Sequence, residues 1–276
     1  MQATKQKNLP AQAGNKPIGV FDSGVGGLSI LAELQILLPN ENFIFLADQK
    51  YVPYGEKSKK ELIELGFRVT DYFVKNHDIK MMVIACNTAT CSTIEELRAR
   101  YSFPIVGTVP AVKPAALKTK NKTIAVISTP STSRSQALKN LIKDNCADID
   151  VLNIGCQNLE NVVEKGELNS KEVNNLLLKY LRRVLDSQAD YLVLGCTHYP
   201  FLKKSIEKIV GPRIKLIDSG YAIAKQTKNL LGSCLMQNKT NKYSKTIYFT
   251  TGSSAKFSKV AGKLLKHKVK SKKAAI

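Results

Sequence analysis

The sequence predicts an α/β fold of two pseudo-symmetric, doubly wound subdomains whose sheets are mainly parallel. Short β-rich runs alternate with helical patterns along almost all of the 276 residues, as in doubly wound α/β proteins. Most of these runs are continuously apolar, as expected of strands that helices cover on both faces. Two of them end in a cysteine followed by hydroxyl residues, at equivalent points of the two halves, which indicates the pseudo-symmetry.

Nine runs are predicted to form strands, with amphipathic helices between them. One helix should begin near Leu28, after the first strand and a glycine-rich turn. The clearest helical pattern follows Ser170, a residue type that favours the N-cap position. Its apolar stripe consists of Val173, Leu176, Leu177, Tyr180, Leu181, Val184 and Leu185. The predicted strands are Ile18–Phe21, Phe43–Ala47, Met81–Ala85, Ile105–Val109, Thr123–Ser128, Asp150–Ile154, Tyr191–Gly195, Ile214–Ile217 and Thr246–Thr250.

No linker rich in glycine, proline or serine separates the two halves. We expect the chain to cross between them in Val109–Lys122, which holds two prolines and a lysine cluster. The predicted organisation is a disordered N-terminal tail (1–16), a first subdomain (17–108 with 217–267), a second subdomain (109–216) and a basic flexible C-terminal tail (268–276).

The charge is large and unevenly placed. The formal net charge is +20, and Ser258–Ile276 carries seven lysines and no acidic residue. Such a segment attracts nucleic acid or anionic surfaces without specificity, so a polyanion is one candidate partner through the basic tail. We interpret the segment mainly as the solvated end of a helix and a flexible tail. The sequence leaves the oligomeric state open, with a homodimer as one candidate.

The cysteine count and the N-terminus favour a cytoplasmic protein. Six cysteines in a chain of this length are too few for a disulfide scaffold. The first sixteen residues lack the apolar segment of a signal peptide. The longest apolar stretches have the length of strands, so we expect no membrane span.

The first predicted strand ends in an acidic residue and a glycine-rich turn, in the segment IGVFDSGVGG (18–27). Glycines allow a tight turn and close approach of the backbone to a ligand. The G-x-G-x-x-G order of dinucleotide sites is absent, and Asp22 would stand where a pyrophosphate should lie. The turn therefore does not indicate a nucleotide site.

Cys86 and Cys196 differ from ordinary buried cysteines by their position. Each closes a predicted strand and precedes a possible helix N-terminus, a location that lowers a thiol pKa from about 8.5. Cys146 and Cys234 are interpreted as small buried side chains instead. Cys91 follows Cys86 at a spacing that does not make a metal site, because zinc sites need ligand pairs at close spacing.

His198 stands beside Cys196 and is a candidate to protonate that thiol or to lower its pKa. The other two histidines, His77 and His267, lie in polar stretches that we expect to be exposed. A cysteine and a histidine also suggest a cysteine hydrolase. That hypothesis leaves Cys86 without a role.

Several longer motifs resemble one enzyme family. They are FDSGVGGLSIL, ADQKYVPYGEKS, IACNTAT, FPIVGTVPAVKPA, LGCTHYPFL and LIDSG, in order from about Ile18 to Gly220, and more weakly TIYFTTGSSAKF to about Phe257. By these motifs the chain resembles the glutamate racemases of the cofactor-independent Asp/Glu racemase superfamily. The resemblance implies an active site between the two subdomains, without pyridoxal phosphate or metal. It also implies an isomerase that interconverts L- and D-glutamate and supplies D-glutamate for peptidoglycan.

The resemblance also implies roles for individual residues. Cys86 and Cys196 take the positions of the two catalytic thiols, with Asp22 and His198 as the polar residues beside them. Asp48 and Glu164 match acidic residues that are tied to activity. The substrate-binding positions are Asp22, Ser23, Tyr54, Gly55, Asn87, Thr88, Thr132, Thr197 and His198.

Two alternatives remain at this point. One is another racemase, isomerase or lyase of the same superfamily that acts on a different acid. The other is a polyanion-binding protein, an alternative that rests only on the charge of the tail.

Overall fold

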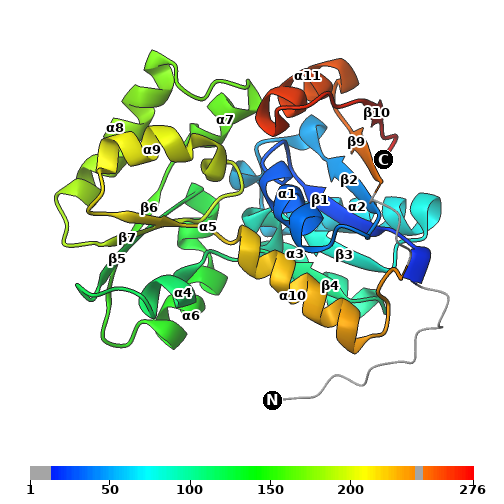
Figure 1. Cartoon of the computed structure of the whole chain (residues 1–276), viewed down its shortest axis with the longest axis horizontal. Helices are drawn as coiled ribbons and strands as arrows, with labels where there is room; N and C mark the ends of the chain where they lie inside the picture. The colour runs from blue at the N-terminus through cyan, green and yellow to red at the C-terminus, as the bar shows by residue number, and fades with distance from the viewer. Residues whose placement is uncertain (1–13, 240–244) are drawn as a thin grey trace.

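The computed structural model describes residues 14–239 and 245–276, which form two lobes (Figure 1). The first lobe contains a parallel six-stranded sheet with the order β10-β9-β2-β1-β3-β4. The second contains a parallel four-stranded sheet with the order β6-β5-β7-β8. The predicted α/β class with parallel sheets is confirmed. The chain builds most of the first sheet, then the whole second sheet, and returns to complete the first.

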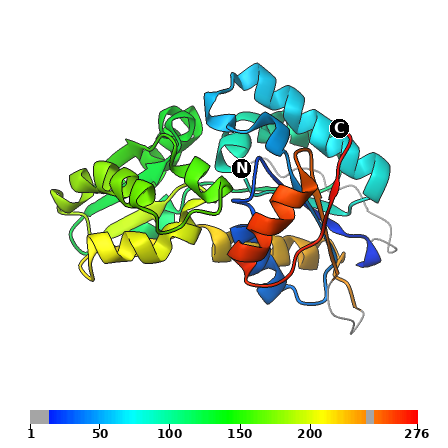
Figure 2. The same ribbon diagram turned by 90° about the horizontal axis from the view of Figure 1, so that it is seen from above.

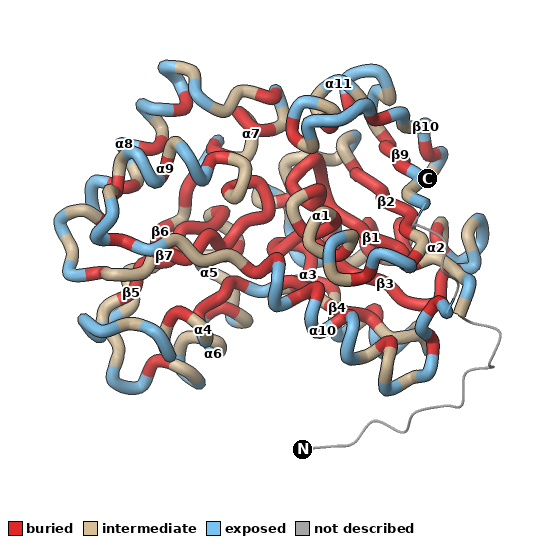
Figure 3. Tube along the Cα trace, viewed as in Figure 1, coloured by how far each residue is buried: buried red, intermediate tan, exposed pale blue. Residues whose placement is uncertain are grey.

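All nine predicted strands are present. Most of their apolar residues are buried, whereas those of the strand at Lys215–Ile217 are only partly buried. In the first sheet they are β1 (Ile18–Asp22), β2 (Phe43–Ala47), β3 (Met81–Ile84), β4 (Ile105–Gly107) and β9 (Thr246–Thr250). In the second they are β5 (Thr123–Ser128), β6 (Asp150–Gly155), β7 (Tyr191–Leu194) and β8 (Lys215–Ile217). Figure 3 shows the strands as the buried centre of each lobe, with the helices presenting exposed outer sides.

Helices cover both faces of each sheet (Figure 2). On the first sheet, α2 (Lys59–His77) and α3 (Asn87–Arg100) pack on one face. The other face carries α1 (Leu28–Leu37), α10 (Gly220–Ser233) and α11 (Ser254–Leu265). On the second sheet, α4 (Val112–Ala116) and α6 (Gln136–Asn145) lie opposite α7 (Leu159–Glu164), α8 (Lys171–Leu185) and α9 (Lys203–Val210), and α5 (Pro130–Arg134) follows β5.

Local signals explain where two of these helices begin. The predicted N-cap of α8 is confirmed, since the Ser170 hydroxyl accepts a hydrogen bond from the Val173 amide at 3.3 Å. The helix predicted near Leu28 begins at that residue.

Among the described residues, no helix is both long enough and apolar enough to cross a membrane.

The C-terminal segment corrects one expectation. The flexible tail predicted over 268–276 is instead an ordered part of the first sheet, in which β10 (Ser271–Lys273) pairs with β9. Val269 and Ala274 are buried, and the Arg68 guanidinium donates to the main-chain oxygen of Ile276 at 2.6 Å. The lysines between them are exposed, so the apolar residues pack the strand while its charges face solvent.

Residues 1–13 of the predicted N-terminal tail (1–16) lie outside the described residues. The rest of it is anchored, because a buried ion pair holds it. Lys80 Nζ lies 2.6 Å from Glu41 Oε2, and it also donates to the main-chain oxygens of Gly14 and Met236 at 2.6 and 2.7 Å. Lys16 forms a further ion pair with Asp78 at 2.7 Å.

Candidate active site

The parallel register brings the two cysteine motifs to one edge of each sheet. β1 pairs with β3, so Asp22 and Cys86 follow neighbouring strands at their carboxyl ends. β5 pairs with β7, which places Thr129 and Cys196 at the corresponding edge of the second sheet. Ligands of open parallel sheets bind outside these edges. In this protein the two edges face each other.

One cavity lies between the two edges and takes walls from both lobes. The space between the atoms there is about 390 Å³, which includes solvent at its open side. Both Cys86 and Cys196 line it. The other lining residues are Ser23, Val52, Pro53, Tyr54, Gly55, Asn87 and Thr88 from the first lobe, and Thr129, Glu160, Glu164, Thr197 and His198 from the second.

The glycine-rich turn after β1 lets the second lobe approach closely. A Cβ atom on Gly24 would overlap the carboxylate of Glu164, and one on Gly26 would overlap the ring of His198. Both glycines therefore make room for side chains of the other lobe.

Cys86 follows β3 by two residues and caps α3, as its position in the sequence predicts. Its sulfur accepts from the Ala89 amide at 3.4 Å and lies 3.6 Å from the Ser23 hydroxyl. The expected lowering of the thiol pKa is wrong for this residue. Burial raises the pKa of Cys86 strongly and the nearby Asp22 carboxylate adds to it, which outweighs the hydrogen bonds from Ala89 and Ser23.

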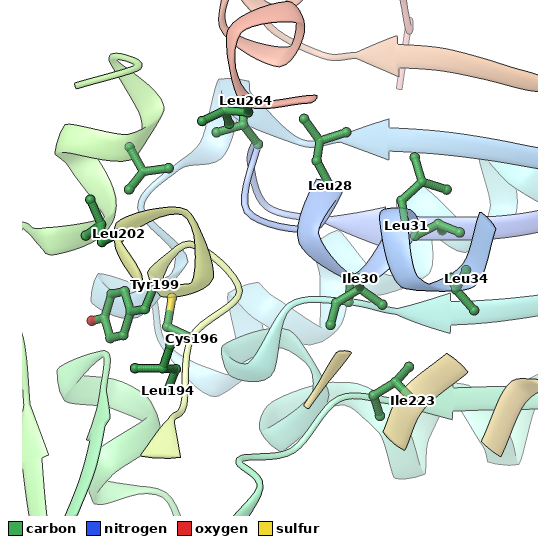
Figure 4. Close-up of a cluster of buried hydrophobic side chains, with 14 of the residues drawn as sticks. Leu28, Ile30, Leu31, Leu34, Leu194, Cys196, Tyr199, Leu202, Ile223 and Leu264 are labelled. Atoms are coloured by element: carbon green, nitrogen blue, oxygen red, sulfur yellow. The ribbon is translucent and has the colours of Figure 1, made fainter. Parts of the chain in front are cut away.

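Cys196 lies against His198 on the opposite wall. Its sulfur is 3.6 Å from His198 Nδ1, and Figure 4 shows it in the same buried cluster as Leu194 and Tyr199. Burial raises the pKa of the Cys196 thiol, so the predicted lowering is wrong here as well. The contact with His198 opposes this rise, whereas the charge that acts most strongly on Cys86 is the carboxylate of Asp22.

His198 and Glu164 form a buried pair behind Cys196. Nε2 of His198 lies 2.7 Å from Glu164 Oε1. Burial alone would lower the pKa of His198, but its contacts with Cys196 and Glu164 raise it well above the ordinary value. Burial would likewise raise the pKa of Glu164, but His198, Gln49 and the Val25 amide hold it below its usual value. We therefore describe the pair as imidazolium and carboxylate.

Asp22 is fully buried and links the two lobes. Its Oδ1 accepts from the Gly24 amide at 2.8 Å, and its Oδ2 accepts from the Thr197 hydroxyl of the second lobe at 3.0 Å. Burial raises the pKa of Asp22, although His198 and these hydrogen bonds oppose the rise. A second contact joins the lobes here, because Ser29 Oγ donates to the Thr197 main-chain oxygen at 2.8 Å.

Asp48 supports the cavity from behind rather than lining it. It accepts from the Tyr54 hydroxyl at 2.6 Å and from the Thr251 hydroxyl at 2.7 Å. Tyr54 and the adjacent Gly55, which belong to the short 3₁₀ helix η3 (Tyr54–Glu56), form part of the wall.

Thr88 and Thr132 meet in a cluster of hydroxyl groups between the lobes. Thr88 Oγ1 lies 3.0 Å from Thr129 Oγ1 and 3.1 Å from Thr132 Oγ1. Thr88 and Thr129 line the cavity, whereas Thr132 lies behind them. Asn87 also lines the cavity, and its amide nitrogen is 3.4 Å from the Thr108 main-chain oxygen.

Three polar residues at the site have no role in the sequence analysis. Thr129 and Glu160 line the cavity, and Gln49 donates to Glu164 Oε2 at 2.6 Å. Glu160 Oε2 is buried without a hydrogen-bond partner among the residues that the structure describes. Gln49 lies inside the quoted motif ADQKYVPYGEKS, which is the only sequence signal for any of the three.

The remaining cysteines and histidines lie away from the cavity wall. Cys146 is buried as predicted, but Cys234 is only partly buried. His267 is exposed as predicted, whereas His77 packs with its ring centroid 4.9 Å from that of Phe249. Within the described residues, no group of three or more His, Cys, Asp or Glu side chains is arranged to hold a metal ion.

Comparisons with known proteins agree on one family. A family model for Asp/Glu/hydantoin racemases matches residues 34–227. The glutamate racemase of Herpetosiphon aurantiacus is 39% identical over 246 residues, which are 89% of this chain and 96% of that protein.

Solved structures agree with this match. A glutamate racemase isoform from Bacillus anthracis has a TM-score of 0.85 and 30% identity, with 95% of this chain and 98% of that chain covered. A glutamate racemase from Francisella tularensis, in complex with D-glutamate, has a TM-score of 0.81 and 30% identity, with 95% and 97% covered.

Proposed function

The chain belongs to the Asp/Glu/hydantoin racemase family, and we propose that it is a glutamate racemase, an isomerase that interconverts L- and D-glutamate. The observation that carries this proposal is the cavity that Cys86 and Cys196 line from opposite lobes. Racemisation removes a proton from one face of the α-carbon and adds one to the other. Two thiols on facing walls provide a base for one face and an acid for the other.

The proton transfer follows from this arrangement. One thiolate takes the α-proton, the bonding electron pair stays on the α-carbon and its carboxylate, and the opposite thiol gives its proton to the other face. The two sulfurs have then exchanged their protonation states. A hydroxyl could not replace either thiol, because it is a far weaker acid.

The two thiols are not equivalent before substrate binds. Burial disfavours the thiolate at both positions, but the imidazolium of His198 stabilises a charge on Cys196 while the carboxylate of Asp22 opposes one on Cys86. We propose that Cys196 loses its proton more readily than Cys86, so that it is the first of the two thiols to form a thiolate as the pH rises. Glu164 then acts behind His198, by keeping the imidazole charged.

The developing carbanion needs donors aimed at the substrate carboxylate, because the α-proton is a very weak acid. We propose that the main-chain amides and the polar side chains at Ser23, Asn87, Thr88 and Thr197 supply these donors, which their place at the cavity supports. At Thr197 the donor is the main-chain amide, because its hydroxyl donates to Asp22. Tyr54, Gly55, Asp22 and His198 complete the substrate site. Asp48 holds Tyr54, and Thr132 holds Thr88, so we assign both a supporting role.

The proposal also covers the subdomains of the protein, the place in the cell where it acts and its oligomeric state. We propose that residues 17–108 with 218–276 form the first subdomain and residues 109–217 the second, which the membership of the strands in the two sheets supports. The predicted bounds at 217 and 267 change because β8 ends at Ile217 in the second sheet and β10 belongs to the first. A racemase that supplies D-glutamate for peptidoglycan would act in the cytoplasm. We also propose that the protein forms a homodimer, which light scattering tests. We propose further that the exposed lysines near β10 bind polyanions, which retention on a polyanion column tests.

Circular dichroism at a single wavelength tests the activity. The signals of L-glutamate and of D-glutamate should both decay to zero with the purified protein. Aspartate serves as the comparison substrate. Decay with aspartate and none with glutamate would assign the chain to a different racemase of the family.

A further inference from the structure

Gln49 connects the first lobe to the acid–base group of the second. It follows β2 in the short 3₁₀ helix η2 (Gln49–Tyr51) and is partly buried. Its Nε2 donates to Glu164 Oε2 at 2.6 Å, and its Oε1 accepts from the Thr250 hydroxyl at 3.0 Å. Thr250 in turn accepts from the Gly252 amide at 3.0 Å.

These contacts fix the amide in one orientation. The Glu164 carboxylate can only accept a hydrogen bond, so the amide nitrogen of Gln49 must point at it, and the amide oxygen is left to accept from the Thr250 hydroxyl. Thr250 is fully buried at the end of β9, which makes this anchor rigid. The direction of the Gln49 side chain is therefore set by the first sheet.

Glu164 receives most of its hydrogen bonds from outside its own lobe. Oε2 accepts from Gln49, and Oε1 accepts from the Val25 amide at 2.6 Å. Only the contact of Oε1 with His198 at 2.7 Å comes from the second lobe. The rotation of this carboxylate, and hence its alignment with the imidazole, depends on donors of the first lobe.

We propose that Gln49 is a positioning residue of the racemase, which holds the Glu164 carboxylate against His198 and so sets the acid–base competence of Cys196. The inference rests on the proposed function. Gln49 does not line the cavity, so it acts through Glu164 and His198 rather than on the substrate. Because Gln49 belongs to the first lobe and Glu164 to the second, the alignment of Glu164 with His198 depends on the two lobes being closed.

Gln49→Met tests the proposal, because methionine has a similar length but neither donates nor accepts strongly. We expect kcat to fall about tenfold or more, since small losses of alignment are costly in catalysis, while KM stays within about twofold. Gln35→Met is the matched control. Gln35 also bonds to a threonine of β9, Thr246, at 2.9 Å, but far from the cavity, and its loss should leave kcat unchanged.

A double-mutant cycle with Glu164→Gln separates positioning from a merely structural role. If Gln49 acts through Glu164, Gln49→Met causes no further loss of kcat in the Glu164→Gln background. If the loss of kcat in the double variant equals the product of the losses in the two single variants, the proposal is overturned. An unchanged kcat in Gln49→Met would overturn it as well. A parent chain that does not racemise glutamate would instead contradict the proposed function.

Gln49→Glu supplies an independent measurement if the doubly changed protein is too inactive. The introduced carboxyl group would face Glu164, alongside the other charged groups near that residue, which are His198, Asp22 and Glu160. When it is protonated, the introduced group can donate to Glu164 in place of the amide, whereas its charged form repels the Glu164 carboxylate. The activity of this variant relative to the parent should therefore rise as the pH falls, and a constant ratio would overturn the proposal.

Discussion

Thr197 and Asp22 meet across the boundary between the lobes, where the threonine hydroxyl donates to Asp22 Oδ2 at 3.0 Å. Thr197 directly follows the thiol of the second lobe, and Asp22 raises the pKa of the thiol of the first. The residue next to one thiol thus contacts the acid that acts on the other. The charge that raises the pKa of the Cys86 thiol is therefore held in place by a hydrogen bond from the lobe that carries Cys196.

Thr197→Val should lower kcat/KM by about tenfold, because a hydrogen bond to a charged group contributes about 1.5–3 kcal/mol. Valine keeps the shape of threonine but leaves Asp22 without its partner from the second lobe. Thr227→Val is the control, since Thr227 is buried in α10 and its hydroxyl donates to the Ile223 main-chain oxygen at 2.8 Å. Equal losses in the two variants would show a general effect of burying valine.

The pH dependence follows from the raised thiol pKa values. The base must be a thiolate, and burial keeps both thiols protonated at neutral pH, so kcat/KM should rise with pH as the thiolate forms. We expect a continuous increase from about pH 6 to about pH 9, since kcat/KM reports the pKa values of the free enzyme. A plateau beginning near neutral pH would mean that the free enzyme already holds a stable thiolate.

The C-terminal strand should matter for stability and turnover. Removal of residues 269–276 exposes the edge of β9 and takes away the buried side chains of Val269 and Ala274. Thr250 ends β9 and contacts Gln49, and the next residue, Thr251, contacts Asp48. We therefore expect lower turnover and a Tm lower by roughly 5 °C or more.

The matched control removes charge and keeps the strand. Lys270→Ser with Lys272→Ser changes two exposed side chains and should leave both Tm and turnover unchanged. If the double lysine variant lowers Tm and turnover as much as the truncation does, the charges of the segment hold it in place and its packing does not.

Much of the fold could be predicted because burial on both faces of a sheet leaves a continuous apolar run in the sequence. Phe43–Ala47 and Thr123–Ser128 are strands with the predicted bounds. β10 could not be predicted because its three residues, Ser271–Lys273, are polar and its buried neighbours Val269 and Ala274 lie outside the strand. Its position depends on the edge of β9, which no local pattern indicates.

The site could be predicted where its chemistry is local. Cys86 and Cys196 stand at strand ends, and both line the cavity. Gln49 and Thr129 act through partners far away in the sequence, so only the packing of the lobes reveals them. The direction of the thiol pKa shifts could not be predicted for the same reason, because burial depends on the second lobe closing over the first.

The most direct test of the account is solvent exchange by Cys86→Ser and Cys196→Ser in deuterated water, measured by NMR alongside circular dichroism. The account predicts that neither variant racemises glutamate, while native far-ultraviolet spectra show that both remain folded. Each variant keeps one thiol, so the α-proton of a single enantiomer can still exchange, and the two variants should differ in which one. Near-normal racemisation by either variant would contradict the mechanism with two thiols.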